Sequence, residues 1–114
     1  MLLEVGEKLH VIYRALFENS TRRHFVGEVI AVDRDICRLQ GYAFIYDTRE
    51  DAFLRKSDKR ITFIDVGSSG HIVNLIPANT DIENVHYRYE RETGLTATDG
   101  GDFELDISEF SFKT

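Results

Sequence analysis

Short runs of apolar and β-branched residues, separated by turn signals, are the feature that most constrains this fold. They cover residues 9–17, 25–32, 36–46, 61–66 and 72–76. Runs this short, bounded by Gly, Asp, Asn and Ser, are typical of a meandering sheet or a small barrel. Gly27 and Gly41 lie inside two of the runs, where a glycine indicates a sharp bend or a close approach of two backbones. The sequence therefore predicts an all-β fold, a small five-stranded and strongly bent barrel, with a short helical cap over residues 1–8.

The only proline, Pro77, ends the fifth run and marks a change of pattern. Residues 1–77 hold 11 Lys and Arg against 11 Asp and Glu, whereas residues 78–114 hold 3 against 9, so the whole net charge of −6 lies in the C-terminal third. We therefore predict a barrel core over 1–77 and an acidic C-terminal β extension over 78–114, packed on the same domain.

The extension alternates apolar and polar residues over 85–90 and again over 103–107, on either side of a predicted loop at 93–101. Alternation of this kind is typical of a half-buried strand. Phe103, Ile107 and Phe110 would also share one face of a helix, so the form of the tail stays open. We expect the tail to dock, most simply as a strand added to a barrel edge, because its large apolar residues are too many to leave in water.

Composition places the chain among soluble globular domains. Of its 114 residues 42% are hydrophobic and 30% are charged, and no apolar run approaches the roughly 20 residues of a membrane span. The first ten residues lack the apolar stretch of a secretory signal, and a single cysteine cannot form an intramolecular disulfide. A cytoplasmic protein with no membrane partner is the expectation.

The sequence contains no nucleophile elbow, phosphate loop or dinucleotide fingerprint. None of the four histidines has a partner at a familiar metal-ligand spacing; they are His10, His24, His71 and His86. The sequence therefore predicts a protein that is not an enzyme, with no metal and no cofactor.

The runs over 61–66 and 72–76 carry apolar residues on both faces of the predicted strands. A strand that is apolar on both faces needs cover on both, and a lone barrel leaves one side in water. Strand edges of this kind tend to pair with another chain. We therefore expect a homo-oligomer that forms through these two strands.

Four basic residues, Arg55, Lys56, Lys59 and Arg60, lie close together between the third and fourth runs. Such a cluster is typical either of a solvated hairpin end with local salt bridges or of a loop that contacts phosphates. The overall acidity argues against strong non-specific nucleic-acid binding, so no DNA partner is expected and any binding of single-stranded RNA would be weak.

The stretch from Gly27 to Cys37 resembles the first signature of the Sm-like (LSm) family. Gly27, Val29, Val32, Asp33 and Ile36 fit it, and Cys37 stands where the family has Asn. The second signature, an Arg-Gly pair before an apolar strand, is similar to the segment from Ser69 to Ile76, in which Gly70 fits and Ser69 replaces the Arg. The resemblance covers residues 1–77.

This resemblance implies a closed ring of six or seven subunits, joined by pairing the fourth strand of one subunit to the fifth strand of the next. It also implies binding of uridine-rich single-stranded RNA at loops that hold Asp33, Ile36, Cys37, Ser69 and Gly70. Cys37 and Ser69 are poorer donors than the usual Asn and Arg, and they offer no guanidinium plane on which a base could stack.

Two alternatives to an RNA-binding ring stay open. The first is a ring or other structural assembly that binds protein only. The second rests on Arg34, Arg38 and the segment Asp65–Gly70, which resemble the PilZ cyclic-dinucleotide signature, with Gly67 in place of its Ser. That resemblance implies a sensor in which paired arginines clamp phosphates and stack on guanine.

Overall fold

The computed structural model describes residues 2–14, 21–68, 70–90 and 94–107, and within them the chain is all-β, as the sequence predicts. The helical part of these residues is a single 3-10 turn, η1 (Ile82–Asn84), and no helix in them is long and apolar enough to cross a membrane. The chain divides into two compact units, Met1–Ala78 and Asn79–Thr114, and each is described by itself.

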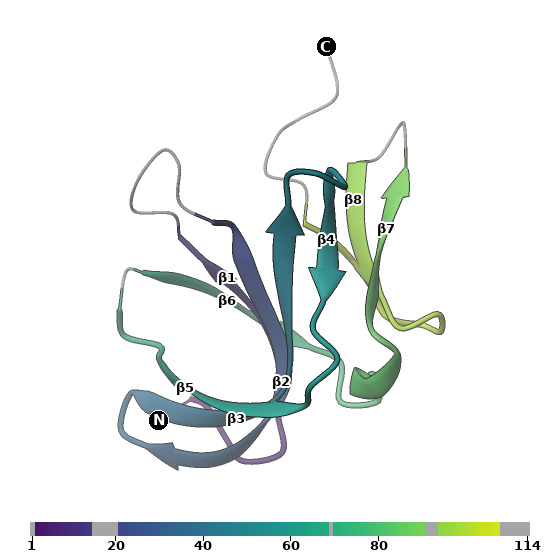
Figure 1. The fold of residues 1–114 in the computed structure, drawn as a ribbon. Helices are drawn as coiled ribbons and strands as arrows, with labels where there is room; N and C mark the ends of the chain where they lie inside the picture. The colour runs from purple at the N-terminus through teal and green to yellow at the C-terminus, as the bar shows by residue number, and fades with distance from the viewer. Residues whose placement is uncertain (1, 15–20, 69, 91–93, 108–114) are drawn as a thin grey trace. The chain divides into compact units, whose positions relative to one another are not determined.

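The first unit is one antiparallel sheet of six strands (Figure 1). The strands are β1 (Lys8–Tyr13), β2 (Arg23–Asp33), β3 (Ile36–Asp47), β4 (Ala52–Arg55), β5 (Arg60–Asp65) and β6 (His71–Ile76). Their order is β4-β3-β2-β1-β6, and β5 pairs with the first half of β3 while β4 pairs with its second half. The last strand therefore returns to pair with the first, and Pro77 follows it directly.

Two glycines let the long strands β2 and β3 approach each other closely. Gly27 lies opposite Gly41 in the register of this pair. A Cβ atom on Gly41 would lie 1.9 Å from the carbonyl oxygen of Val26, a distance at which the backbone must move. A register shift between Val29 and Ala31 adds a bulge, which bends a strand further. The close approach predicted from the two glycines is thus present.

Both faces of the sheet centre are buried. The inner face carries the main cluster, formed by Leu9, Val11, Phe25, Val29, Cys37, Leu39, Ala43 and Ile64. The opposite face buries two histidines among apolar residues: His10, His24, Val26, Tyr42 and Phe44. The rings of His10 and His24 meet edge to face with their centroids 5.2 Å apart, and His24 stacks on Phe53 at 4.5 Å. The long apolar runs of β2 and β3 reflect this burial on both sides.

The second unit is a three-stranded antiparallel sheet of order β7-β8-β9. Its strands are β7 (His86–Glu90), β8 (Gly94–Thr98) and β9 (Glu104–Asp106). Asp99, directly after β8, ties the start of the unit to the turn before β9, because its carboxylate accepts backbone hydrogen bonds from Asp81 at 2.9 Å and from Gly101 at 2.8 Å. These hydrogen bonds, led by the one from Asp81, lower the pKa of the Asp99 carboxyl group.

Several local predictions differ from the structure. Residues 2–7 form no helix, β4 is an additional short strand, and residues 94–98 of the predicted loop are strand β8. β8 lies between β7 and β9, and all five of its residues are buried. β9 pairs with β8 rather than with an edge of the first sheet. The predicted strand residues 15–17 and the tail residues Phe110 and Phe112 lie outside the described residues.

Candidate assembly interface

Three strands of the first unit, β4, β5 and β6, have one edge each with no strand partner among the described residues, and β4 pairs only with β3. β5 pairs only with β3, and β6 pairs only with β1. β4 has four residues, and β5 and β6 have six each. An unpaired edge presents a row of backbone N–H and C=O groups, which is a template for pairing with another chain.

The edge of β5 exposes large apolar side chains. Ile61 is 54% exposed and Phe63 is 65% exposed, whereas Ile64 on the other face of the strand is buried in the core. The alternation follows from the two-residue period of a strand. The guanidinium of Arg38 lies 5.1 Å from the centroid of the Phe63 ring, which is within cation–π range.

The edge of β6 exposes apolar side chains on both of its faces. Leu75 is 65% exposed, although it lies opposite Leu9, a core residue, in the β1–β6 register. Ile72 on the other face is 42% exposed. Leu75 therefore lies at the rim of the inner face. β1 covers one side of it, and no strand of the described sheet covers the other side.

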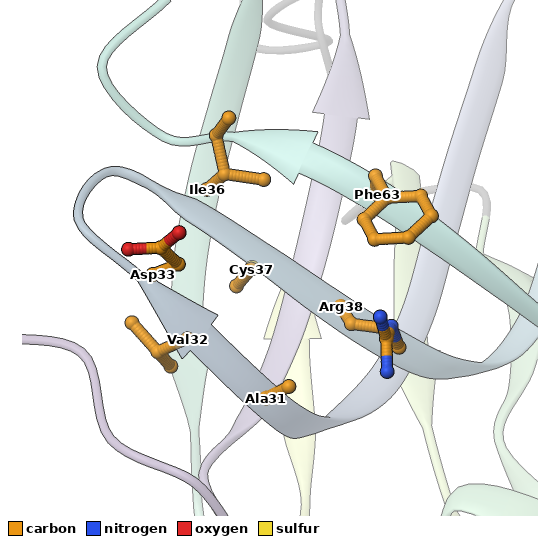
Figure 2. A pocket seen from close by; sticks show the side chains of 7 residues that line it. All are labelled: Ala31, Val32, Asp33, Ile36, Cys37, Arg38 and Phe63. Atoms are coloured by element: carbon orange, nitrogen blue, oxygen red, sulfur yellow. The ribbon is translucent and has the colours of Figure 1, made fainter.

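An open pocket of about 230 Å³ lies at the turn between β2 and β3, and Phe63 of the neighbouring strand β5 contributes to its lining (Figure 2). It is lined by Ala31, Val32, Asp33, Ile36, Cys37, Arg38 and Phe63. Asp33 and Arg38 are its charged members, and the others are apolar. Cys37 is only 1% exposed, and burial raises the pKa of its thiol, which makes it a poor nucleophile.

The structure brings some of the residues predicted for RNA binding together. Asp33 and Ile36 pair with each other across the β2–β3 turn, and both are exposed. Gly70 immediately precedes β6, where its amide donates to Ser68 Oγ at 3.0 Å, while Ser69 lies outside the described residues. Cys37 is buried beneath this turn, so its side chain is not presented to a base.

The loops at this end of the sheet are acidic. The amide of Val66 donates to the carbonyl of Asp35 at 2.8 Å, which ties the turn before β3 to the turn after β5. A Cβ atom on Gly67 would lie 3.2 Å from the carboxylate of Asp35 and 3.3 Å from that of Asp65. Asp33, Asp35 and Asp65 therefore gather where the resemblance places RNA, and carboxylates repel phosphates.

The four basic residues lie elsewhere along β3. Arg55 pairs with Phe44 and Arg60 with Gly41, and all four side chains are exposed. Gly41 is five residues beyond Ile36, roughly 17 Å along an extended strand. The guanidinium of Arg55 lies 4.3 Å from the centroid of the Tyr42 ring. The structure thus separates the basic cluster from the turn that carries Asp33 and Ile36.

The pocket contains residues that the sequence analysis had not joined into a site. Arg38 and Phe63 are 25 positions apart and meet because they are paired in the β3–β5 register. Arg34, the other arginine of the PilZ-like pattern, lies in the β2–β3 turn with a φ of 56°. In the part of the chain that the structure describes, no cluster of three or more His, Cys, Asp or Glu residues could hold a metal ion.

Comparison with known proteins adds no relative: no family model matches the chain, and neither a curated protein nor a solved structure is significantly similar to it.

Proposed function

We propose that this chain is a non-enzymatic, self-assembling module of Sm-like type, in which the β5 edge of one copy pairs with the β6 edge of the next. The observation that carries the proposal is the exposure of Phe63 and Leu75 on β5 and β6, the two longer of the three strands that have an unpaired edge in the described sheet. Fully burying one such side chain is worth roughly 1.5–3 kcal/mol, so covering both edges would favour association.

The arrangement of the edges supports a closed assembly. β5 and β6 are different surfaces, so pairing one with the other joins copies head to tail. A head-to-tail contact generates a ring when its rotation closes. The bent β2–β3 pair, with its facing glycines and bulge, supports the resemblance to the Sm-like family, whose members assemble in this way.

A charged residue introduced on either edge is expected to dissociate the oligomer into folded monomers. Phe63→Lys and Leu75→Lys each place an ammonium group in the proposed contact, where it would be desolvated without a partner. Light scattering at micromolar concentration should show an oligomer for the wild type and a monomer for both variants, with near-unchanged circular dichroism.

Val5→Lys is the matched control, because Val5 is 64% exposed but lies in the turn before β1. It should leave the oligomer intact. A monomeric wild type at the same concentration would contradict the proposed function, and so would an oligomer that both edge variants preserve.

Weak binding of single-stranded RNA is a second candidate, favoured by the exposure of all four basic residues of the cluster. If these four residues contact phosphates, the binding constant should fall as the salt concentration rises. A plot of the logarithm of the binding constant against the logarithm of the salt concentration should then have a slope of roughly −3 for four contacts. Replacing Arg55, Lys56, Lys59 and Arg60 with Ala should bring this slope close to zero in a fluorescence-anisotropy titration with oligouridine. Absence of wild-type binding at low salt would exclude RNA and leave assembly with protein alone.

A further inference from the structure

We propose that the β4 strands of two copies of this chain pair antiparallel about a two-fold axis, with the two Phe53 residues opposite each other. This contact goes beyond the proposed function, because it uses the third unpaired edge of the first sheet rather than β5 or β6. It joins like with like, so it ends at a pair of copies instead of continuing head to tail.

The backbone of β4 presents hydrogen-bonding groups on its uncovered side. The amide of Lys56, directly after the strand, donates to the carbonyl of Ala43 in β3 at 2.8 Å. Because the direction of these groups alternates along a strand, the N–H and C=O groups of Leu54 also face β3, whereas those of Phe53 and Arg55 face away from it. A second strand laid on this side can therefore extend the ladder.

The charges on either side of β4 have opposite signs. The turn before it, residues 47–51, has three acidic residues and one basic residue, whereas residues 55–60 have four basic residues and one acidic residue. A strand with an acidic start and a basic end is complementary to a second copy that runs antiparallel to it. A parallel copy would bring acid to acid and base to base, which disfavours that direction.

The face of β4 that carries Phe53 favours the register. With the two Phe53 residues opposite each other, Asp51 of each copy comes beside Arg55 of the other. The carboxylate of Asp51 accepts a hydrogen bond from the hydroxyl of Tyr46, and the guanidinium of Arg55 lies 4.3 Å from the centroid of the Tyr42 ring. Tyr42 and Tyr46 are four positions apart in β3 and share one face of it, so both charges already lie on the same face.

The opposite face of β4 agrees with this register. It places Leu54, which is 45% exposed, against the small Ala52 of the second copy, and it brings Glu50 beside Lys56. A shift of two residues would bring Glu50 to Asp58, where like charges repel. A shift of one residue would join opposite faces of the two sheets, which the period of two residues forbids.

Charge exchange tests the contact in full-length Phe63→Lys, in which the β5 edge is blocked. Because β4 has four residues and a stable interface has roughly 20–30 a side, this chain should be monomeric at micromolar concentration and half dimeric at roughly 0.5 mM. Asp51→Arg and Arg55→Asp should each weaken dimerisation at least about tenfold in sedimentation equilibrium, because each places like charges opposite each other twice. Asp51→Arg with Arg55→Asp restores opposite charges and should recover the dimer.

Glu4→Arg is the matched control, because Glu4 is exposed, lies before β1 and changes the net charge as much as Asp51→Arg does. It should leave dimerisation at least as strong. Asp51→Arg also reduces the net charge of −6, which by itself favours association, so overall charge cannot cause the expected loss. A Phe63→Lys chain that stays monomeric at about 1 mM would overturn the inference and leave the proposed function standing.

Cysteine cross-linking tests the register in chains that keep Asp51, Phe53 and Arg55. Ala52→Cys chains mixed with Leu54→Cys chains should form covalent dimers on mild oxidation, because these positions would be a non-hydrogen-bonded pair with Cα atoms about 4.5 Å apart. Either variant alone should form few. The wild type should form none, because its native cysteine is buried.

The cross-linking outcomes separate this contact from the proposed function. Covalent dimers from Leu54→Cys alone, at a yield above that of the mixture, would overturn the register. A mixture without covalent dimers would overturn the contact, whether or not the wild type is an oligomer at micromolar concentration. A wild type that is monomeric at micromolar concentration, yet cross-links in the mixture at high concentration, would contradict the proposed function and support the β4 contact.

Discussion

Gly41→Ala is expected to destabilise the folded chain by about 4 kcal/mol or more, at the upper end of what a single substitution does. The added Cβ would lie 1.9 Å from the carbonyl oxygen of Val26 and 2.6 Å from the Cα of Gly27, and both of these are backbone atoms. A flexible side chain could move aside, but here two strands would have to separate at their closest approach. Urea unfolding followed by circular dichroism measures the loss.

Gly70→Ala is the control for this substitution. Its added Cβ would lie 3.3 Å from the side-chain oxygen of Ser68, an exposed residue whose side chain can move aside. We expect a change within about 1 kcal/mol. If Gly41→Ala and Gly70→Ala lowered the free energy of unfolding equally, the backbones of β2 and β3 would be farther apart at Gly41 than the structure shows.

Acidification is expected to remove about 5 kcal/mol of stability between pH 7.5 and pH 4.5, through His10 and His24. Burial, together with the charge of His24, lowers the pKa of His10 to about 3, and burial, together with Arg22, lowers that of His24 to about 4. In the unfolded chain both have the ordinary value of 6.5. As pH falls below 6.5 the unfolded state therefore takes up protons that the folded state does not, and stability is lost.

Comparison of variants isolates this effect from the carboxylates that titrate over the same range. Urea unfolding at pH 7.5 and pH 4.5 gives the difference in the free energy of unfolding between the two conditions. His10→Phe and His24→Phe should each remove about half of the part of this difference that the histidines cause. His86→Gln should keep the wild-type difference, because His86 is exposed. Imidazole NMR signals of His10 and His24 that titrate near pH 6.5 in the folded protein would contradict the prediction.

The sheet edges link the fold to the proposed function. The period-two pattern that buries Ile64 in the core also directs Ile61 and Phe63 outward, so the same strand contributes to both the core and the edge. A charge at the outward-facing Phe63, or at the exposed Leu75 on the rim of the inner face, is therefore expected to disrupt the proposed assembly while the buried Ile64 stays unchanged. This separation is why Phe63→Lys and Leu75→Lys test association and Gly41→Ala tests the fold.

Strand composition and turn chemistry were enough to determine the all-β class from the sequence. Gly27 and Gly41 indicated the close approach of β2 and β3, because glycine has no Cβ atom to hold two neighbouring backbones apart. Pro77 marked the end of β6, since proline cannot donate a hydrogen bond to a ladder. These features depend on properties of single residues and their neighbours in the chain.

The strands that the sequence analysis missed depend on pairing partners. β4 is four residues long, and it forms opposite the second half of β3. Residues 94–98 read as a loop because of Gly94 and the glycines at 100 and 101, yet β7 and β9 pair with them on both sides. Hydrogen bonds to two neighbours outweigh a weak local preference, and no local pattern contains that information.

The candidate interface shows the same division. The sequence identified both strands as apolar on two faces, and from this it predicted a partner for them. Only the tertiary structure decided that Cys37 is buried, that Arg38 lies over Phe63, and that the basic cluster is distant from Asp33 and Ile36. Those relations follow from the register between strands far apart in the chain, where a shift of one residue would exchange the two faces.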